Sequence, residues 1–191
     1  EAVKPWLKKW IQGSHYHKVA WEARGSGMGN TVSDDGWALF KRNMLKARES
    51  VSEAWALEPD HAGVAAELIA IGLQKGDSDR HTEMKHWYRE MKKVQADFDE
   101  GYASVMWGLR PRWGGSLSRM VRFGEELLAE GRFDSNAPYW YLQAHRDASS
   151  EWDLPSAYFP KFRDYRELGR LFDGFENEPK REPWRDFDRS Q

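Results

Sequence analysis

The residues whose types and spacing could best support binding form one stretch in the middle of the chain, Leu109-Arg110-Pro111-Arg112-Trp113-Gly114-Gly115-Ser116. Pro111 fixes its own φ and disfavours helix before it, so we expect the preceding helix to end near Leu109. Gly114 and Gly115 allow backbone angles that are closed to other residues. Ser116 is a good N-cap, so we expect a new helix to start there.

This stretch is the candidate binding site of the chain. The candidate binding residues, for a protein or an anion, are Arg110, Arg112, Trp113, Gly114, Gly115, Ser116 and Arg119. The N–H groups of residues 115–117 would face outward at a helix N-terminus beside three guanidinium groups, an arrangement that suits an anion. The alternative is a tight turn between helices, in which Trp113 is buried and the arginines pair with acidic residues. The sequence favours this structural interpretation and leaves the binding site open.

Signals for catalysis are few. Glu83 and His86 lie three residues apart, which is one half of a di-iron carboxylate pattern, but the chain contains no second Glu-x-x-His. We therefore interpret them as a surface pair. Nucleophile-elbow, zinc-protease and dinucleotide-binding motifs are also absent from the sequence. The sequence predicts no catalytic residue and leaves enzymatic activity unsettled, with a non-enzyme favoured.

The histidines do not form a recognisable ligand set. His15 and His17 would point in different directions from one helix, and no third ligand accompanies them. His61 at a helix start and His145 near a helix end are interpreted as structural. We therefore expect no bound metal and no cofactor.

Composition narrows the class of protein. The 191 residues include 29 Lys and Arg against 31 Asp and Glu, and the net charge of −2 argues against a nucleic-acid partner. Hydrophobic residues make up 40% and charged residues 31%, as in soluble globular proteins. No apolar run approaches the ~20 residues of a membrane span. The absence of cysteine excludes disulfides and thiol catalysis.

The sequence does not identify the cellular compartment of the protein. The sequence starts at Glu1 rather than at Met, so a signal peptide, a lipid anchor or a further domain could precede it. Both the cytoplasm and the periplasm fit. The 11 tryptophans are spread along the chain, which indicates use in helix contacts rather than in one aromatic binding face.

Apolar residues recur with helical spacing along most of the chain, and no segment alternates as a strand would. The sequence therefore predicts an all-α fold. Gly13-Ser14 is a possible break in the first helix, and Gly76-Asp77-Ser78-Asp79 is expected to form a turn. The predicted helices span residues 5–24, 33–57, 61–74, 80–96, 99–109, 116–130, 138–144 and 161–173.

The helices form pairs with a recurring hinge. The segment from Ala54 to His61 resembles the end of a tetratricopeptide repeat, and weaker copies follow at intervals of about 40 residues. These features predict irregular helical hairpins stacked into a short solenoid over residues 1–150. Residues 151–175 are expected to form an aromatic-rich connector and a capping helix, and residues 176–191 a polar, extended tail. An irregular helical bundle is the alternative.

The Pro-Arg-Trp-Gly-Gly-Ser segment, together with Ala20-Trp21-Glu22-Ala23-Arg24-Gly25, resembles an uncharacterised bacterial family of degenerate tetratricopeptide-like proteins. The resemblance covers residues 12–148. It implies a helical-repeat fold in a bacterial protein and no particular reaction or ligand.

These observations favour a non-enzymatic protein-binding module, because helical solenoids offer extended concave surfaces for a partner. One concrete form is a bacterial inhibitor or immunity protein that neutralises a cognate toxin. The alternative is an enzyme or receptor that uses the arginine-rich turn to bind an anionic small molecule. The sequence does not identify the partner, the oligomeric state or the binding face.

Overall fold

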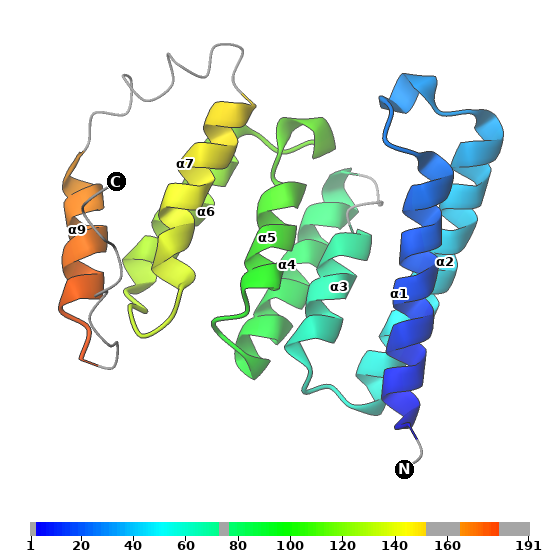
Figure 1. Ribbon diagram of the computed structural model, residues 1–191, viewed down its shortest axis with the longest axis horizontal. Helices are drawn as coiled ribbons and strands as arrows, with labels where there is room; N and C mark the ends of the chain where they lie inside the picture. Colours follow the sequence, from blue (N-terminus) through cyan, green and yellow to red (C-terminus); the bar gives the residue numbers. More distant parts are fainter. Residues whose placement is uncertain (1–2, 73–76, 152–164, 180–191) are drawn as a thin grey trace, which may run out of the picture. The chain divides into compact units, whose positions relative to one another are not determined.

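The structure is a computed structural model, and it describes residues 3–72, 77–151 and 165–179. Every regular element in these ranges is helical, which confirms the all-α prediction (Figure 1). The α-helices are α1 (Pro5–Arg24), α2 (Asp34–Leu57), α3 (Ala62–Gly72), α4 (Asp77–Val94), α5 (Asp99–Gly108), α6 (Leu117–Glu130), α7 (Trp140–Ser150) and α9 (Tyr165–Glu176). Short 3-10 helices are η1 (Gly29–Thr31), η2 (Pro111–Trp113) and η3 (Ala137–Tyr139). None of the helices described is both long and apolar enough to cross a membrane.

The helix ends follow the signals in the sequence. The Ser33 hydroxyl accepts the Gly36 N–H at 3.1 Å at the start of α2. The Ser116 hydroxyl accepts the Arg119 N–H at 3.2 Å at the start of α6. α6 ends at Gly131, whose φ of 66° is a left-handed conformation that glycine adopts without strain.

Two local predictions are wrong. α1 runs without a break through Gly13 and Ser14, because Gly13 faces α2 and the Ser14 hydroxyl donates to Glu67 on α3. Residues 77–79 belong to α4 rather than to a turn. Acidic residues are favourable in the first turn of a helix, which explains why this segment can begin one. The helix expected from Pro138 is observed: it begins as η3 and continues from Trp140 as α7, which extends beyond the predicted end at Ala144.

The chain divides into two compact units, Glu1–Val105 and Met106–Gln191. This division lies within α5. The boundaries expected from the sequence, at residues 150 and 175, stay a prediction. Much of the predicted connector, residues 152–164, and of the predicted tail, residues 180–191, lies outside the part of the chain that the structure describes.

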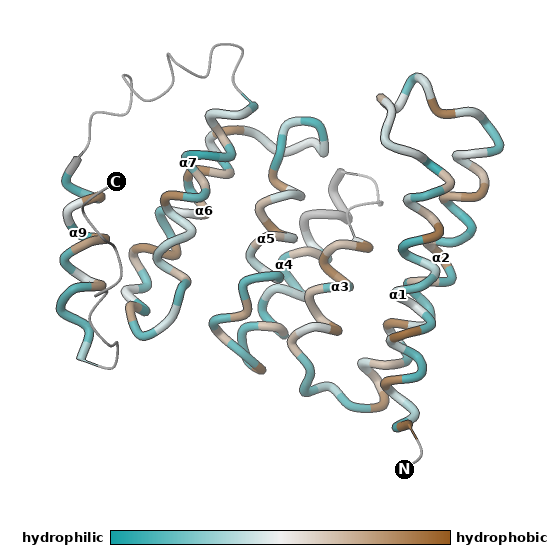
Figure 2. Tube along the Cα trace, viewed as in Figure 1, coloured by the Kyte–Doolittle hydropathy of each residue, from teal (hydrophilic) through white to brown (hydrophobic). Residues whose placement is uncertain are grey.

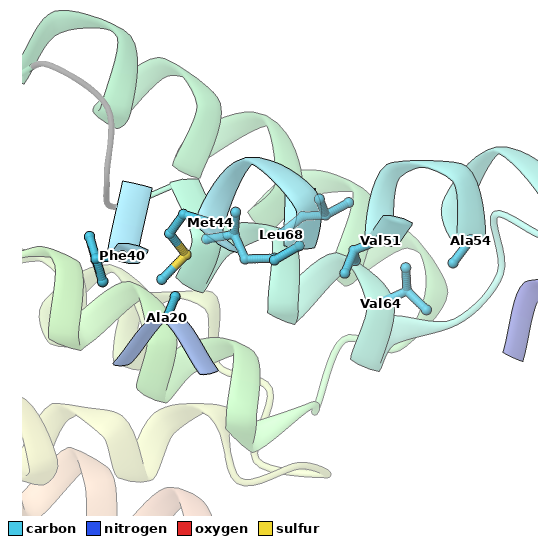
Figure 3. Close-up of a cluster of buried hydrophobic side chains, with 9 residues drawn as sticks. Ala20, Phe40, Met44, Val51, Ala54, Val64 and Leu68 are labelled. Carbon is cyan, nitrogen blue, oxygen red and sulfur yellow. The ribbon is translucent and has the colours of Figure 1, made fainter. Parts of the chain in front are cut away.

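In the first unit, α1 packs along α2, and α3 packs along α4. The core between these helices consists of Ala20, Phe40, Met44, Ala47, Val51, Ala54, Val64, Leu68 and Ile71 (Figure 3). Partly buried aromatic residues surround it: Trp6, Trp10, Tyr16, Trp21, Trp37, Trp55 and Trp87. The hydropathy of the trace alternates along these helices, as expected where one face is buried (Figure 2).

The crossing of α1 and α2 depends on Gly13. A Cβ at this position would lie 3.1 Å from the carbonyl oxygen of Ala47 and 3.1 Å from the amide nitrogen of Val51. Both neighbours are backbone atoms, so they cannot move aside without separating the helices. Gly13 therefore sets how closely α1 approaches α2.

The second unit repeats this device. A Cβ on Gly124 of α6 would lie 2.7 Å from the Ala144 Cβ and 3.0 Å from the Tyr141 Cα of α7. α9 packs on this pair through Leu171, which is buried with Leu128 and Tyr141. The helix predicted over residues 161–173 is thus observed as α9, docked by its apolar face.

We expect Gly13→Ala to destabilise the first unit. Alanine favours helix by ~1 kcal/mol over glycine, but overpacking at a rigid contact costs about 1–3 kcal/mol. Gly72→Ala on α3 is the matched control, because the nearest atoms to its added Cβ are side-chain atoms of Glu83 at 3.7 Å. Urea unfolding followed by circular dichroism measures both variants. Gly13→Ala with stability equal to the wild type would contradict the close crossing.

Candidate functional site

The arginine-rich turn is a compact backbone structure. Arg110 is extended, with φ −64° and ψ 147°, and η2 follows it directly. The Arg110 carbonyl accepts the N–H of Trp113 at 2.9 Å and that of Gly115 at 3.1 Å. The expectation of an outward-facing N–H at Gly115 is therefore wrong, because this donor closes the turn instead of facing a ligand.

The two consecutive glycines are required for different reasons. Gly114 has a φ of 77°, in the left-handed region where a side chain is strained. Gly115 has an ordinary φ, but a Cβ on it would lie 2.8 Å from the Leu109 Cα and still closer to the Leu109 carbonyl. The turn thus combines one conformational and one steric requirement for glycine.

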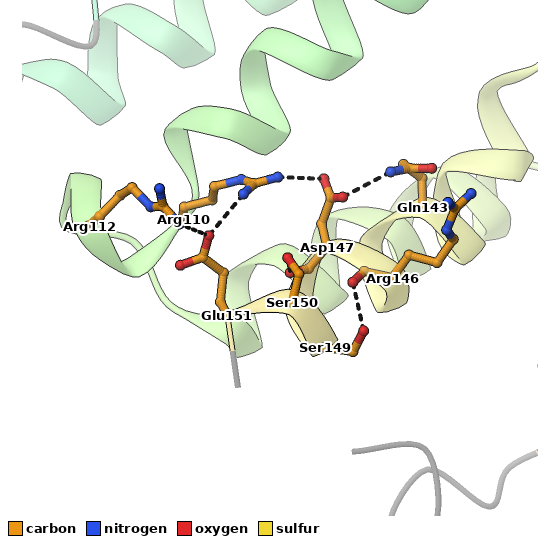
Figure 4. A network of polar contacts seen from close by, with 8 residues as sticks. All are labelled: Arg110, Arg112, Gln143, Arg146, Asp147, Ser149, Ser150 and Glu151. Carbon is orange, nitrogen blue, oxygen red and sulfur yellow. Dashed lines mark hydrogen bonds and ion pairs between the residues drawn. The ribbon is translucent and has the colours of Figure 1, made fainter. Parts of the chain in front are cut away.

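The arginines of the turn pair with two carboxylates at the end of α7 (Figure 4). Arg110 donates from Nη1 to Glu151 Oε1 at 2.9 Å and lies 3.3 Å from Asp147 through Nη2. Arg112 donates to the same Glu151 oxygen. Gln143 donates to the other oxygen of Asp147 at 2.9 Å. We call Arg110, Arg112, Asp147 and Glu151 the arginine–carboxylate cluster.

An indole ring lies beneath this cluster. The Arg110 guanidinium lies 4.7 Å from the centre of the Trp107 ring, and the Arg112 guanidinium lies 5.7 Å from it. Trp113 packs against Trp107 at a centroid distance of 6.4 Å. Cations over an indole face gain a further attraction from the ring quadrupole. Trp107 therefore contacts both arginines of the cluster.

The side chains of this site differ in the fraction that is exposed to solvent. The side chains of Arg110 and Glu151 are 16% and 10% exposed, whereas that of Arg112 is 52% exposed. Trp107 is also exposed over 39% of its surface. Arg110 and Glu151 are therefore internal, and Arg112 with Trp107 forms the accessible part of the site.

Helix electrostatics explain why arginines are needed here. Asp147 and Glu151 lie one turn apart at the C-terminal end of α7, where the helix dipole disfavours negative charge. Two guanidinium groups offset both the dipole and the repulsion between the carboxylates. Sequence reasoning missed Asp147 and Glu151, because the helix predicted over residues 138–144 ends before both, whereas α7 extends to Ser150.

The remaining predicted site residues have backbone roles. Ser116 caps α6 with its hydroxyl. Arg119 donates from Nη1 to the Gly114 carbonyl at 3.4 Å. Trp113 is half-buried beside Trp107. The structure thus brings all seven predicted residues into one turn and commits several of their polar groups to contacts inside it.

Glu83 and His86 do not form the predicted surface pair. The side chain of Glu83 on α4 is largely buried and forms an ion pair with Arg48 on α2. Arg48 also donates to the Ile71 carbonyl at 3.4 Å, so it connects three helices. His86 is exposed and packs edge-on against Trp87 at 4.7 Å. The prediction was wrong because the ion pair joins residues 35 positions apart.

A second polar network joins α1 to α3 through Glu67. Its carboxylate accepts the Trp10 indole N–H at 2.6 Å and the Ser14 hydroxyl at 2.5 Å, and its other oxygen lies 3.3 Å from His17 Nδ1. Trp21 donates to His17 Nε2 at 3.0 Å. With Nε2 acting as an acceptor, the proton of a neutral His17 lies on Nδ1 and points to Glu67. Both ring nitrogens of His17 are therefore occupied by protein groups.

His15, which the sequence paired with His17, and His145, which it interpreted as structural, lie in different environments. His15 is exposed on α1 and lies 5.9 Å from the Tyr16 ring. His145 is buried in α7 against Tyr141, and this burial lowers the pKa of its imidazole. A buried neutral His145 agrees with a structural role.

No known protein-family model matches the chain, and no significant match occurs among curated proteins or solved structures. The protein is therefore characterised by its own structure, as an all-α chain of paired helices with an arginine–carboxylate cluster at one turn.

We expect Glu151→Gln to destabilise the second unit by about 1–3 kcal/mol, because Arg110 would keep its buried charge with one partner fewer. Arg112→Gln should cost less than about 1 kcal/mol, since this exposed arginine can be solvated. Hydrogen exchange of the α6 and α7 amides measures both effects locally. Equal costs for the two variants would contradict the distinction between internal and accessible arginines.

Glu67 should make the stability of the first unit depend on pH. Burial raises the pKa of this carboxyl, but the hydrogen bonds from His17, Ser14 and Trp10 outweigh it, so the pKa lies below its ordinary value of 4.5. Its contribution is therefore present above pH 4.5 and is lost as the pH falls from there through the lowered folded-state pKa.

Unfolding of the wild type and of Glu67→Gln across this pH range tests the linkage. The difference in unfolding free energy between the two proteins should be largest near neutral pH and should shrink in acid. A difference that stays constant with pH would show that the carboxylate charge contributes nothing.

Proposed function

We propose that this chain is a non-enzymatic protein-binding module whose helical pairs stack in the manner of tetratricopeptide repeats. The pairs α1–α2, α3–α4 and α6–α7 support this proposal, because each consists of consecutive helices packed side by side. α9 would serve as the C-terminal cap, since it covers apolar residues of α6 and α7. The resemblance to degenerate repeat proteins of bacteria belongs to the same proposal.

The observation that carries the proposal is the accessible pair of Trp107 and Arg112. Tryptophan and arginine are the residue types most often responsible for affinity at protein interfaces. Glu151 and the Trp107 ring hold the Arg112 guanidinium in place. Because the Arg112 side chain is already held by these contacts, a partner that binds there would restrict it little further, which reduces the entropic cost of association.

In a bacterial setting, such a module would act as an inhibitor or immunity protein that binds a cognate toxin. Its partner would present an aromatic or carboxylate group to the Trp107–Arg112 surface. This form of the proposal is supported by the all-helical fold and by the structural use of the polar clusters described above.

The alternative, binding of an anionic small molecule, has less support from the geometry. Arg110 already contacts two carboxylates, and Arg112 shares one of them. The two positive and two negative charges of the cluster compensate each other. An anion would therefore compete with Glu151 for Arg112 rather than enter a positively charged site.

The test of the proposal is affinity capture from a lysate of the source organism, with the purified chain as bait. Mass spectrometry identifies the retained proteins. Trp107→Leu and Arg112→Gln are the test variants, and Arg89→Gln on α4 is the matched control because Arg89 is exposed and outside the cluster. A single stoichiometric partner should be retained by the wild type and by the control, and its affinity should fall at least about tenfold in either test variant.

Two outcomes would contradict the proposal. A partner bound equally well by all four proteins would place the interface elsewhere on the chain. No retained protein, together with binding of inorganic phosphate that Arg112→Gln abolishes, would favour the anion receptor. Circular dichroism of each variant confirms that helicity is unchanged.

A further inference from the structure

The turn between α2 and α3 brings three potential metal ligands together. Glu58, Asp60 and His61 each offer one ligand atom, and these three atoms all lie within 4.8 Å of one another. His61 Nε2 is 3.2 Å from Asp60 Oδ1 and 3.7 Å from Glu58 Oε1. The cluster lies outside the arginine–carboxylate cluster and is independent of the proposed function.

These separations fit a tetrahedral ion. With zinc–nitrogen and zinc–oxygen bonds of about 2.0–2.2 Å, neighbouring ligand atoms in a tetrahedral site lie about 3.3–3.5 Å apart. The two distances from His61 Nε2 fall just below and just above this range. Both distances from His61 Nε2 are thus close to those of a tetrahedral site, in which water would take the fourth position.

The environment of the His61 imidazole, whose side chain is 31% exposed, supports the same site. Its Nε2 is buried and makes no hydrogen bond, although two carboxylate oxygens lie close to it. A ring nitrogen that paired with these carboxylates would be expected to align with one of them. A divalent ion between the three groups would replace these two ion-pair contacts with direct bonds to the ring nitrogen and to both carboxylates.

The fold holds the ligands in place before any ion binds. Trp6 of α1 stacks on the His61 ring at a centroid distance of 3.7 Å and fixes its plane. The Glu58 N–H ends α2 by donating to the Ala54 carbonyl, and the His61 carbonyl accepts the Val64 N–H at the start of α3. The ligands thus occupy a short turn whose two ends are anchored in helices.

Charge determines the kind of ion. Two carboxylates and a neutral imidazole carry a net charge of −2, which a divalent cation would neutralise. One imidazole ligand favours Zn²⁺ over Mg²⁺ and Ca²⁺, which prefer oxygen alone. Lys4 Nζ lies 3.4 Å from Glu58 Oε1. Because Lys4 is an exposed residue, this ammonium group can leave when a stronger cation arrives.

We propose that Glu58, Asp60 and His61 form a Zn²⁺ site that joins the end of α2 to the start of α3. His61 supplies the nitrogen ligand, and the two carboxylates supply the oxygen ligands. Bound zinc stabilises the first unit, because it binds the folded turn and not the unfolded chain.

Calorimetric titration of the full chain with Zn²⁺ tests the site. Asp60→Asn and His61→Gln remove one ligand each, and Asp60→Asn keeps the shape of a largely exposed side chain. His15→Gln is the matched control, since His15 is an exposed histidine of the same unit. Lys4→Gln removes the competing cation without touching a ligand.

The wild type and His15→Gln should bind one equivalent of Zn²⁺, and both ligand variants should bind at least about tenfold more weakly. Lys4→Gln should bind about two- to fivefold more tightly, the size expected for an exposed ion pair. Zinc should shift the indole resonance of Trp6, and Mg²⁺ should not compete.

Three results would overturn the proposal: a wild-type chain that takes up no Zn²⁺, binding that survives in both ligand variants, or binding that is lost in His15→Gln instead. The last two would place the ion at other histidines. Circular dichroism and the melting temperature without zinc show whether each variant is folded, so that lost binding is not mistaken for unfolding.

Discussion

Two of the described helix pairs, α1–α2 and α6–α7, form by close approach of two backbones at a glycine. Gly13 meets Ala47 and Val51 at the crossing of α1 and α2, and Gly124 meets Ala144 at the crossing of α6 and α7. No larger residue fits at either point, so bulky rings lie around the crossings instead of within them. This explains why tryptophans surround the core of the first unit and are spread along its sequence.

Hydrogen bonds and ion pairs of three carboxylates hold distant segments of the chain together. Glu67 accepts donors from α1, Glu83 pairs with Arg48 of α2, and Glu151 pairs with the arginines of the turn. Each bond joins segments far apart in sequence, and an unpaired buried carboxylate would be costly. These interactions define which helix faces can meet, and they use polar residues that could otherwise have served in catalysis.

The use of polar side chains in internal contacts also determines which residues remain exposed at the candidate interaction surface. Arg110 is committed to holding the turn against α7, and this leaves Arg112 and Trp107 at the surface in fixed positions. The proposed recognition of another macromolecule rests on this exposed aromatic–arginine pair. The turn between α2 and α3 differs, because its histidine and two carboxylates lie within 4.8 Å of one another and His61 Nε2 makes no hydrogen bond.

The sequence by itself determined the helices, the caps at Ser33 and Ser116, and the position of the arginine-rich turn, because these depend on local spacing and on backbone preferences. It placed the seven candidate residues together because they are neighbours in the chain. Only the tertiary structure decided what their charges contact, since Asp147 and Glu151 reach the turn through the packing of α7. It also decided that Gly13 is a contact rather than a break, because a glycine in a helix has the same local signature in both roles.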